Sequence, residues 1–399
     1  MQPTHVHPGQ SLDGRRWMGV GRADLVDGRQ AAANAVRAAC NGREPKLLLV
    51  FSAITYDPAT VVAGLQDAAP GVPAVGCTTH GELGPGGPTD GTVTVAALGG
   101  PGFSVACAVE EHASGRQRES GAAVARCLEQ VEPLAHRVLL LLTDGMVRDQ
   151  ESILRGVYGV AGAAVPLFGG ACADGWRMTG GFLIADGRVL TDAVVGVALS
   201  SDAPLSVAVR HGWHKVGDPM IVTDSGDGRV YMLDDAPALD TYLDRLDAPP
   251  EAYTEADALV AFALSRPLGV QRRSGVEARN MSTEIDLAGR SIGGGGAIDI
   301  GGLIWAMEGD EASILKATDA ACDEALARLD GKSPVGLLTF SCAALRAVLG
   351  DEGIQREGAH IEQRAGNTPF VGFYTYGEIA RVRGIDGFHN QTLAVLALG

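Results

Sequence analysis

The chain lacks long apolar runs. Among its 399 residues, no apolar stretch approaches the roughly 20 residues that a membrane-spanning helix needs. The opening segment MQPTHVHPGQ has neither the basic region nor the apolar region of a secretory signal. We therefore expect a soluble cytoplasmic protein that does not engage a membrane.

Positive charge is also scarce. The 32 Lys and Arg residues are outnumbered by 48 Asp and Glu residues, which gives a formal net charge of −16. No cluster of basic residues interrupts this acidic balance. Because such a surface repels the phosphates of nucleic acids, we expect no nucleic-acid partner.

Cysteines are few and scattered, at positions 40, 77, 107, 127, 172, 322 and 342. These seven residues form no C-x-x-C pair, which argues against a disulfide framework and a zinc knuckle. The absence of C-x-x-C-H means that any haem would be held noncovalently. The common hydrolase, metalloprotease and nucleotide-binding motifs are missing too, since no G-x-S-x-G, H-E-x-x-H, Walker loop or strand-to-helix G-x-G-x-x-G occurs.

What the chain does contain is a repeat. The segments GCTTHGEL at 76–83 and GFYTYGEI at 372–379 match, and closing apolar runs follow them at 92–99 and 392–399. A third copy is indicated by PLFG and by VVGVALS at 194–200. Self-similarity on this scale reports architecture before chemistry. We predict that residues 47–99, 138–200 and 335–398 superpose as one unit.

Each copy has helix signals and strand signals in the same order. In the first copy, Asp27 is a plausible N-cap for an Ala-rich helix, and Asp57 with Pro58 begins a second helix after the strand LLLVF. Apolar runs such as VLLLLT are too short for amphipathic helices and lack alternation, which favours strands buried on both faces. The predicted fold class is α/β, with mixed sheets and flanking helices built from repeated αβαββ units.

The sequence between the second and third copies has a different character. Residues 212–230 indicate strands joined by Gly-Asp turns, a short helix follows around ALDTYLDRL, and residues 268–302 are rich in turn signals. We predict two domains, 19–228 with two copies of the repeat and 229–399 with the third.

These motifs carry a family resemblance. GCTTHGEL, HGWHKVGDPMIVT, GGLIWAMEGDEASIL and the terminal GFYTYGEIARVRGIDGFHNQT occur in the order that is typical of FIST proteins, and the match runs from about Gly19 to Gly399. The resemblance implies a sensory module that binds a small molecule and signals to a kinase, a cyclase or a chemoreceptor. No output domain is evident, so we expect the partner to be a separate protein. One branch of the family resembles haem-binding nitric-oxide sensors.

Glycines at the strand ends suggest where a ligand would bind. A glycine there lets backbone N–H groups point into a pocket, which suits an anionic group. Glu82 and Glu378 occupy the same place in two copies, where paired carboxylates serve acid/base chemistry, bind an ammonium group or hold a turn. Arg381 and Arg383 follow Glu378 and offer either a carboxylate clamp or surface ion pairs.

Histidines and aromatic residues complete the candidate site. His211 and His389 follow the family pattern and are the better candidates for a haem ligand, whereas His80 stands where small residues are usual in the family. The alternative is that each histidine is a hydrogen-bonded structural residue. We predict a ligand site built from eight residues: His80, Glu82, His211, Trp213, Tyr376, Glu378, Arg381 and His389.

The sequence therefore predicts a sensor rather than a catalyst. The ligand is expected to be an amino acid or another small carboxylate, and the first alternative is a haem-binding nitric-oxide sensor. The second alternative is a cysteine-dependent enzyme, because Cys342 follows the strand LLTFS and precedes a helix whose dipole would favour a thiolate.

Overall fold

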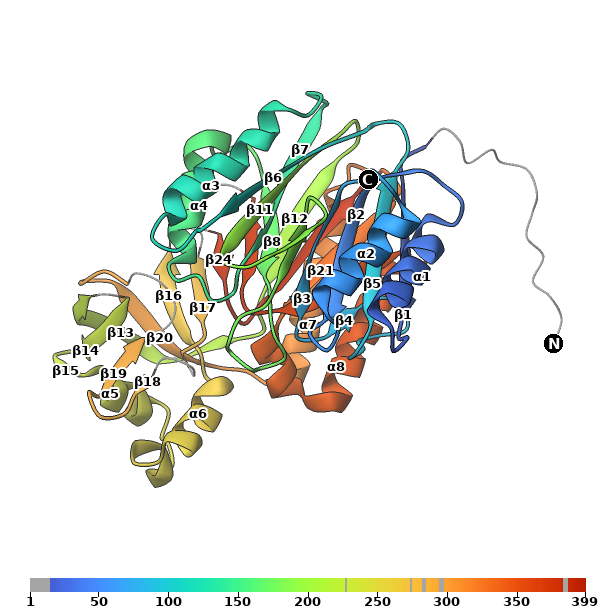
Figure 1. Cartoon of the computed structure of the whole chain (residues 1–399). Helices are drawn as coiled ribbons and strands as arrows, with labels where there is room; N and C mark the ends of the chain where they lie inside the picture. Colours follow the sequence, from blue (N-terminus) through green and yellow to red (C-terminus); the bar gives the residue numbers. More distant parts are fainter. Residues whose placement is uncertain (1–14, 227, 273–274, 282–284, 294–297, 383–386) are drawn as a thin grey trace.

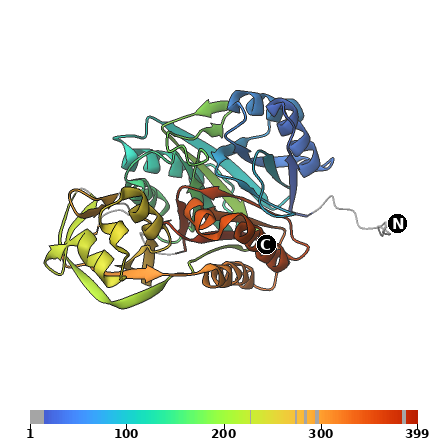
Figure 2. The ribbon, with the colours of Figure 1, turned by 90° about the horizontal axis from the view of Figure 1, so that it is seen from below.

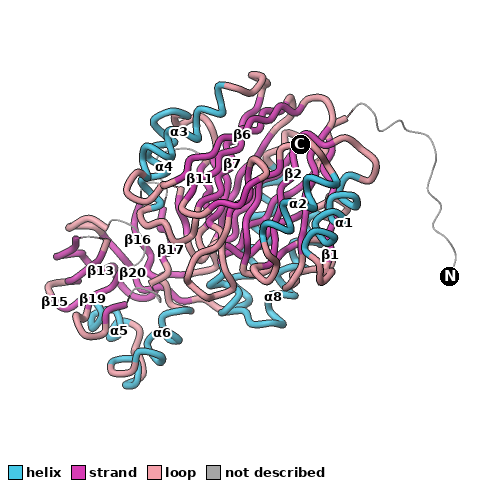
Figure 3. The backbone as a smooth tube through the Cα atoms, in the orientation of Figure 1, coloured by secondary structure: helices cyan, strands magenta, loops and turns pink. Residues whose placement is uncertain are grey.

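The computed structural model describes residues 15–226, 228–272, 275–281, 285–293, 298–382 and 387–399. The molecule consists of a large body of sheets and helices and a smaller lobe beside it (Figure 1). Figure 3 shows the strands of the body on the inside and its helices on the outside. Within the described ranges, no helix is long and apolar enough to cross a membrane.

The body is built from three units, each of which begins with a strand. The first unit comprises β1 (Trp17–Ala23), α1 (Gly28–Cys40), β2 (Pro45–Ala53), α2 (Pro58–Ala68), β3 (Ala74–Thr79), β4 (Glu82–Leu83) and β5 (Val93–Gly99). The second comprises β6 (Phe103–Glu111), α3 (Gln117–Ala125), η1 (Arg126–Glu129), β7 (His136–Thr143), α4 (Gln150–Ala161), β8 (Leu167–Ala171), β9 (Leu183–Ala185), β10 (Arg188–Leu190) and β11 (Ala193–Ser201).

The third unit is interrupted by the lobe. It comprises β12 (Leu205–Arg210), α7 (Glu311–Ala327), β21 (Gly336–Cys342), α8 (Ala343–Ala365), β22 (Phe370–Thr375), β23 (Glu378–Arg381), β24 (Phe388–His389) and β25 (Leu393–Leu398). The lobe is inserted between β12 and α7, so it separates the first strand of the unit from the rest.

Local sequence explains the first two helices. The Asp27 side chain accepts a hydrogen bond of 2.8 Å from Gln30 N, and the Asp57 side chain accepts one of 3.0 Å from Ala59 N. Each carboxylate satisfies an N–H group that the first helical turn leaves without a partner. Pro58 at the first position of α2 has no N–H to satisfy. The predicted helix starts are confirmed.

The three units share one strand order. The sheets run β1-β5-β2-β3-β9-β10, β6-β11-β7-β8-β23-β24 and β12-β25-β21-β22-β4. In each sheet the second and third strands of this order are antiparallel, and the third and fourth are parallel. The fold is therefore mixed α/β, as predicted. The superposition of residues 47–99, 138–200 and 335–398 stays a prediction.

Each sheet also takes a strand from another unit. The first sheet receives β9 from the second unit, the second sheet receives β23 from the third, and the third sheet receives β4 from the first. The three units thus exchange strands in a closed cycle: the first gives a strand to the third, the third to the second, and the second to the first. Strand ends of different units therefore meet.

A glycine recurs at one position of the parallel pair in all three sheets. A Cβ atom on Gly76, Gly169 or Gly372 would overlap the carbonyl oxygen of the residue opposite it on the neighbouring strand. Only glycine allows this close approach of the two backbones, which explains why the segments PAVG at 73–76, PLFG at 166–169 and PFVG at 369–372 all end in glycine.

The main core lies where the inner faces of the sheets meet. Four phenylalanines pack there, and ring centroids are 4.5 Å apart for Phe168 and Phe340, 4.5 Å for Phe340 and Phe373, and 4.8 Å for Phe51 and Phe373. The outer faces are covered by α1 with α2, by α3 with α4, and by α7 with α8. This burial on both faces accounts for the continuous apolar strands in the sequence.

The lobe forms one antiparallel sheet with helices against it, and it projects from the body in two views (Figures 1 and 2). It comprises β13 (His214–Gly226), β14 (Arg229–Leu233), β15 (Ala236–Pro237), α5 (Ala238–Arg245), η2 (Pro250–Tyr253), α6 (Ala256–Leu264), β16 (Leu268–Arg272), β17 (Gly275–Arg279), β18 (Ile285–Asp286), β19 (Ser291–Gly293) and β20 (Leu303–Glu308). The domain boundary predicted at 228–229 falls at the turn between the paired strands β13 and β14.

Candidate functional site

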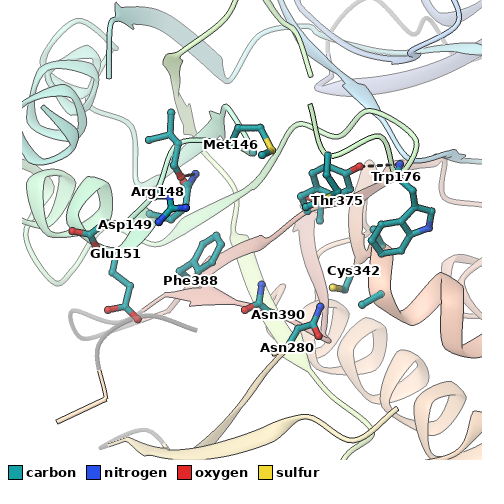
Figure 4. Close-up of a pocket in the computed structure, with 17 residues that line it drawn as sticks. Met146, Arg148, Asp149, Glu151, Trp176, Asn280, Cys342, Thr375, Phe388 and Asn390 are labelled. Atoms are coloured by element: carbon teal, nitrogen blue, oxygen red, sulfur yellow. Dashed lines mark hydrogen bonds between the residues drawn. The ribbon is translucent and has the colours of Figure 1, made fainter. Parts of the chain in front are cut away.

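A pocket of about 290 Å³ opens where the second and third units meet the lobe (Figure 4). Its described walls comprise residues 145–151, Trp176, Met178, Asn280, 342–344, Thr375, Tyr376, Phe388 and Asn390. Most of these residues lie at or after the ends of β7, β8, β21 and β22, or just before β25, and the exchange of strands brings them together. Phe388 belongs to β24, and Asn280 follows the lobe strand β17. Of the eight residues predicted for the site, Tyr376 lies in this wall.

The loop that carries Trp176 is held by a buried carboxylate. Asp174 accepts hydrogen bonds from the backbone N–H groups of Met178, Thr179 and Gly180, at 2.8–3.0 Å. Tyr376 adds a hydroxyl hydrogen bond of 2.5 Å to the same carboxylate and accepts one of 2.9 Å from Trp176 N. Burial alone would raise the pKa of Asp174, but these hydrogen bonds outweigh it and lower the pKa to about 2. The loop is therefore anchored at neutral pH.

His80 lies beside this loop. Its ring packs edge-on to Trp176, with 4.8 Å between ring centroids, and Trp176 lies 6.0 Å from Tyr376 by the same measure. Burial, followed by the positive charge of Arg346, lowers the pKa of His80 to about 4. The His80 imidazole is therefore neutral at pH 7, and its ring contributes packing against Trp176 rather than charge near the pocket.

At the floor of the pocket, a cysteine lies in front of a buried carboxyl group. Cys342 lines the pocket, and the Glu378 carboxyl lies behind it, fully buried. Thr392 donates two hydrogen bonds to Glu378 Oε2, at 3.1 Å from N and 2.7 Å from Oγ1. Among the described residues no N–H or O–H group donates to Oε1, and the Cys342 thiol interacts with the Glu378 carboxyl. Burial raises the pKa of both groups, which disfavours a reactive thiolate.

Glu82 has the corresponding position in the first unit, but it is outside the pocket wall. It is fully buried, and Thr79 and Thr92 donate hydrogen bonds to its two oxygens, at 2.5 Å and 2.6 Å. Burial raises the pKa of Glu82 to about 7, and these hydrogen bonds oppose the rise. The arrangement matches the turn-holding role that the sequence left open.

Ion pairs connect the pocket to the lobe. Glu151, in the pocket wall, lies 3.6 Å from a nitrogen of Arg279 and 3.8 Å from a nitrogen of Arg272, both on lobe strands. Glu277 pairs with the same Arg279 at 2.8 Å. Because Arg279 and Glu277 are buried, their charges depend on one another for compensation. Movement of Glu151 would therefore disturb the attachment of the lobe.

Two family models match the chain, FIST N domain over residues 46–236 and FIST C domain over residues 238–381. The chain belongs to the FIST family. FIST domains are generally small-ligand-binding domains of signal-transduction sensors. The border between the two models falls at the start of α5, so the lobe is divided between them.

Related FIST sequences are recorded without a known function. The chain is 26% identical to the uncharacterised protein Rv0628c of Mycobacterium tuberculosis over 391 residues, which is 95% of this chain and 98% of that protein. It is 26% identical to the uncharacterised protein Mb0898c of Mycobacterium bovis over 235 residues, 57% of this chain and 58% of that protein. A solved structure, PurLQS from Thermotoga maritima, aligns at a TM-score of 0.22 and 9% identity over 96% of this chain and 72% of its own.

The two FIST-motif histidines are engaged with the backbone. His211 Nδ1 accepts a hydrogen bond of 3.3 Å from Trp213 N, so its Nε2 carries the proton and donates to Val276 O at 3.3 Å. His389 Nε2 lies 2.9 Å from Ala380 O. Axial ligation of haem needs an imidazole nitrogen that faces a cavity, and these Nε2 atoms face carbonyl oxygens instead. The arrangement of these two histidines does not fit an axial haem ligand.

The remaining predicted residues lie away from the pocket. Trp213 is buried and donates its indole N–H to Gln391 O at 2.9 Å. Arg381 is buried, and it donates hydrogen bonds to the carbonyl oxygens of Gly162 and Val165 at 3.0 Å and 2.9 Å. Arg383, the other member of the predicted clamp, is outside the described residues. The ligand-binding role of the eight residues stays a prediction.

The sequence interpretation missed Arg148, Asn280 and Asn390 in the pocket wall. A signal for one of them was present. Arginine occurs four residues after Asp144 and four residues after Cys342. These two residues lie at the carboxyl ends of β7 in the second unit and β21 in the third. A comparison of the copies beyond the matching segments would have identified Arg148.

Proposed function

We propose that this FIST protein is a small-ligand sensor whose ligand binds in the pocket between the second unit, the third unit and the lobe. One observation carries the proposal: the pocket wall combines residues from the region matched by the FIST N model, such as Trp176, with residues from the region matched by the FIST C model, such as Asn280 and Tyr376. A ligand that contacts both regions favours the arrangement in which they are close together.

The response would pass through the lobe. Glu151 is at once a wall residue and a partner of Arg272 and Arg279. A ligand that attracts or displaces Glu151 changes the ion pairs of the lobe, and the altered lobe surface is then read by a separate signalling protein, such as a kinase, a cyclase or a chemoreceptor. The ligand would be an amino acid or another small carboxylate, since the wall offers aromatic surface together with amide and charged groups.

Thermal unfolding with a metabolite panel tests the proposal. A ligand that binds only the folded protein raises the free energy of unfolding by RT ln(1 + [L]/Kd), so a saturating hit raises the melting temperature. Tyr376→Ala, in the pocket wall, should lower the affinity for that hit at least tenfold, about 1.4 kcal/mol. Thr254→Ala, on the exposed surface of the lobe, serves as the control and should leave the affinity unchanged.

Mass spectrometry of the same samples separates a sensor from an enzyme. A sensor leaves its ligand intact, so the compound should be recovered unchanged after hours with the protein. Conversion of the hit, with conversion lost in Cys342→Ala, would instead establish the cysteine-dependent enzyme. An absence of any stabilising compound in the panel would count against the sensor.

A further inference from the structure

One arginine in the body shows how the fold binds a carboxylate. Arg346, in the first turns of α8, donates hydrogen bonds to both oxygens of Asp90, at 2.7 Å and 2.6 Å. The same guanidinium donates one of 2.7 Å to His80 O. The hydrogen bonds from Arg346 hold the pKa of Asp90 below its ordinary value. This bidentate pair joins the third unit to the first.

The pocket repeats this arrangement between the second and third units. Main-chain pairing makes Asp144 equivalent to Cys342, since Asp144 N donates to Ala193 O and Cys342 N donates to Thr392 O at the same step of the two sheets. Arg148 and Arg346 each stand four residues further along the chain. Both arginines therefore follow a strand end and face the strand end of the next unit.

The groups opposite the two arginines correspond as well. His80 and Tyr376 occupy equivalent positions. His80 lies four residues after Gly76, which pairs with Val50, and Tyr376 lies four residues after Gly372, which pairs with Thr339. Asp90 and Asn390 are equivalent in the same way. Asp90 lies five residues before Val95, which pairs with Val50, and Asn390 lies five residues before Val395, which pairs with Thr339. Arg148, Tyr376 and Asn390 all line the pocket.

The two sites differ at the position of the carboxylate: where the first has Asp90, the second has the neutral amide of Asn390. Arg148 is exposed, and its guanidinium makes no hydrogen bond or ion pair within the described part of the chain. The neighbouring carboxylates are engaged elsewhere, since Asp149 accepts hydrogen bonds from Ser152 and Glu151 pairs with Arg155 at 3.1 Å. The pocket has kept the arginine and lost its internal partner.

We propose that Arg148 binds the carboxylate of the ligand, in the role that Arg346 has for Asp90, and that Asn390 keeps this place open to a carboxylate from outside. The proposal rests on the pocket being the ligand site of the proposed sensor. Figure 4 shows Phe388 between Arg148 and Asn390, so the body of the ligand would lie over the Phe388 ring while its carboxylate meets the guanidinium. An aromatic surface beside a cation suits a small organic acid.

Isothermal titration with matched pairs of compounds tests the proposal. The probes are the twenty common L-amino acids, benzoate and succinate, each with its carboxamide, together with inorganic phosphate and a set of neutral sugars and polyamines. We expect a carboxylate to bind and its carboxamide to bind at least tenfold more weakly. Arg148→Gln should lower the affinity for that carboxylate at least tenfold, and Asn390→Asp should lower it as much, because the new carboxylate occupies the guanidinium and repels the ligand.

Two controls and the contrary results complete the test. Arg126→Gln, which removes an exposed arginine of η1 that is not among the lining residues, should leave the affinity unchanged, and circular dichroism checks that each variant is folded. Equal binding of carboxylate and carboxamide, unchanged affinity in Arg148→Gln, or tighter binding of phosphate would each overturn the inference. A sugar or a polyamine that binds in the pocket would overturn it while leaving the sensor intact, whereas a panel without any binder would sink both.

Discussion

The Thr79 hydroxyl donates a hydrogen bond of 2.5 Å to the Glu82 carboxyl, but the equivalent Thr375 hydroxyl does not reach Glu378. Thr375 donates instead to Ala171 O at 2.6 Å, on the strand end of the second unit. One scaffold thus holds two buried carboxyls differently. In the first unit both oxygens of Glu82 have hydroxyl donors. In the third, Oε1 of Glu378 has no N–H or O–H donor among the described residues, and the Cys342 thiol of the pocket wall interacts with this carboxyl.

Thr79→Val should lower the free energy of unfolding by about 1–3 kcal/mol, because it leaves a buried oxygen of Glu82 without its donor. Urea unfolding monitored by circular dichroism measures the change. Thr254→Val removes an exposed hydroxyl with no side-chain hydrogen bond among the described residues, and it should change the same quantity by less than about 0.5 kcal/mol. Equal effects of the two substitutions would show that the Thr79 hydrogen bond is not a source of stability.

Glu82 should make the protein less stable as the pH rises. Its pKa is 4.5 without the fold and about 7 within it, so the folded state binds the proton more tightly. The stabilisation is complete below pH 4.5, declines by up to about 1.4 kcal/mol per pH unit above it, and is gone above pH 7. Urea unfolding between pH 5 and pH 8 should show a smaller decline in Glu82→Gln than in the natural protein. Parallel profiles for the two proteins would contradict the assignment.

Tyr376→Phe should loosen the loop that carries Trp176. The substitution removes a hydrogen bond to Asp174 and the acceptor for Trp176 N, so we expect a shifted tryptophan emission spectrum. The pKa of Asp174, which is about 2 in the folded protein, should rise. A carboxyl group whose pKa is lowered by folding stabilises the fold at pH values above its ordinary pKa, and this stabilisation is lost on acidification. The variant should therefore unfold at a higher pH in an acid titration. Unchanged emission together with an unchanged acid midpoint would disprove the anchoring role.

Haem should bind this protein no better than it binds an unrelated acidic protein. The Nε2 atoms of His211 and His389 are engaged with carbonyl oxygens, and ligation would leave those oxygens without donors inside the protein. Optical spectra after addition of haem measure the Soret band. A sharp band that is lost in His211→Ala or His389→Ala, with the fold retained, would restore the gas-sensor alternative.

Local sequence predicted the elements of the body well. Asp27 and Asp57 cap helices through bonds to residues two or three positions away, and such short-range chemistry is legible in a single chain. Gly76, Gly169 and Gly372 also lie in short segments that resemble one another, since each unit needs the same close approach of two strands at that position. The exchange of strands between units was not foreseen, because pairing across units depends on contacts that no short segment encodes.

The site was less predictable because its chemistry depends on which partners a residue finds in three dimensions. His211 and Arg381 belong to matching motifs, yet the fold turns both toward backbone carbonyls. Arg148 lies outside those motifs, and its availability follows from the presence of an amide rather than a carboxylate at position 390, more than 200 residues away. That distance in the sequence hides the relationship until the units are aligned.

The exchange of strands has a consequence for synthesis on the ribosome. When the first two units have emerged, β4 lacks its partner strand β22 and the β8 edge of its sheet lacks β23, because both partners follow almost 300 residues after β4 and about 200 residues after β8 in the sequence. Exposed edges of this kind pair with other chains. A nascent chain would therefore depend on chaperone protection, or on rapid elongation, until the last thirty or so residues close the cycle.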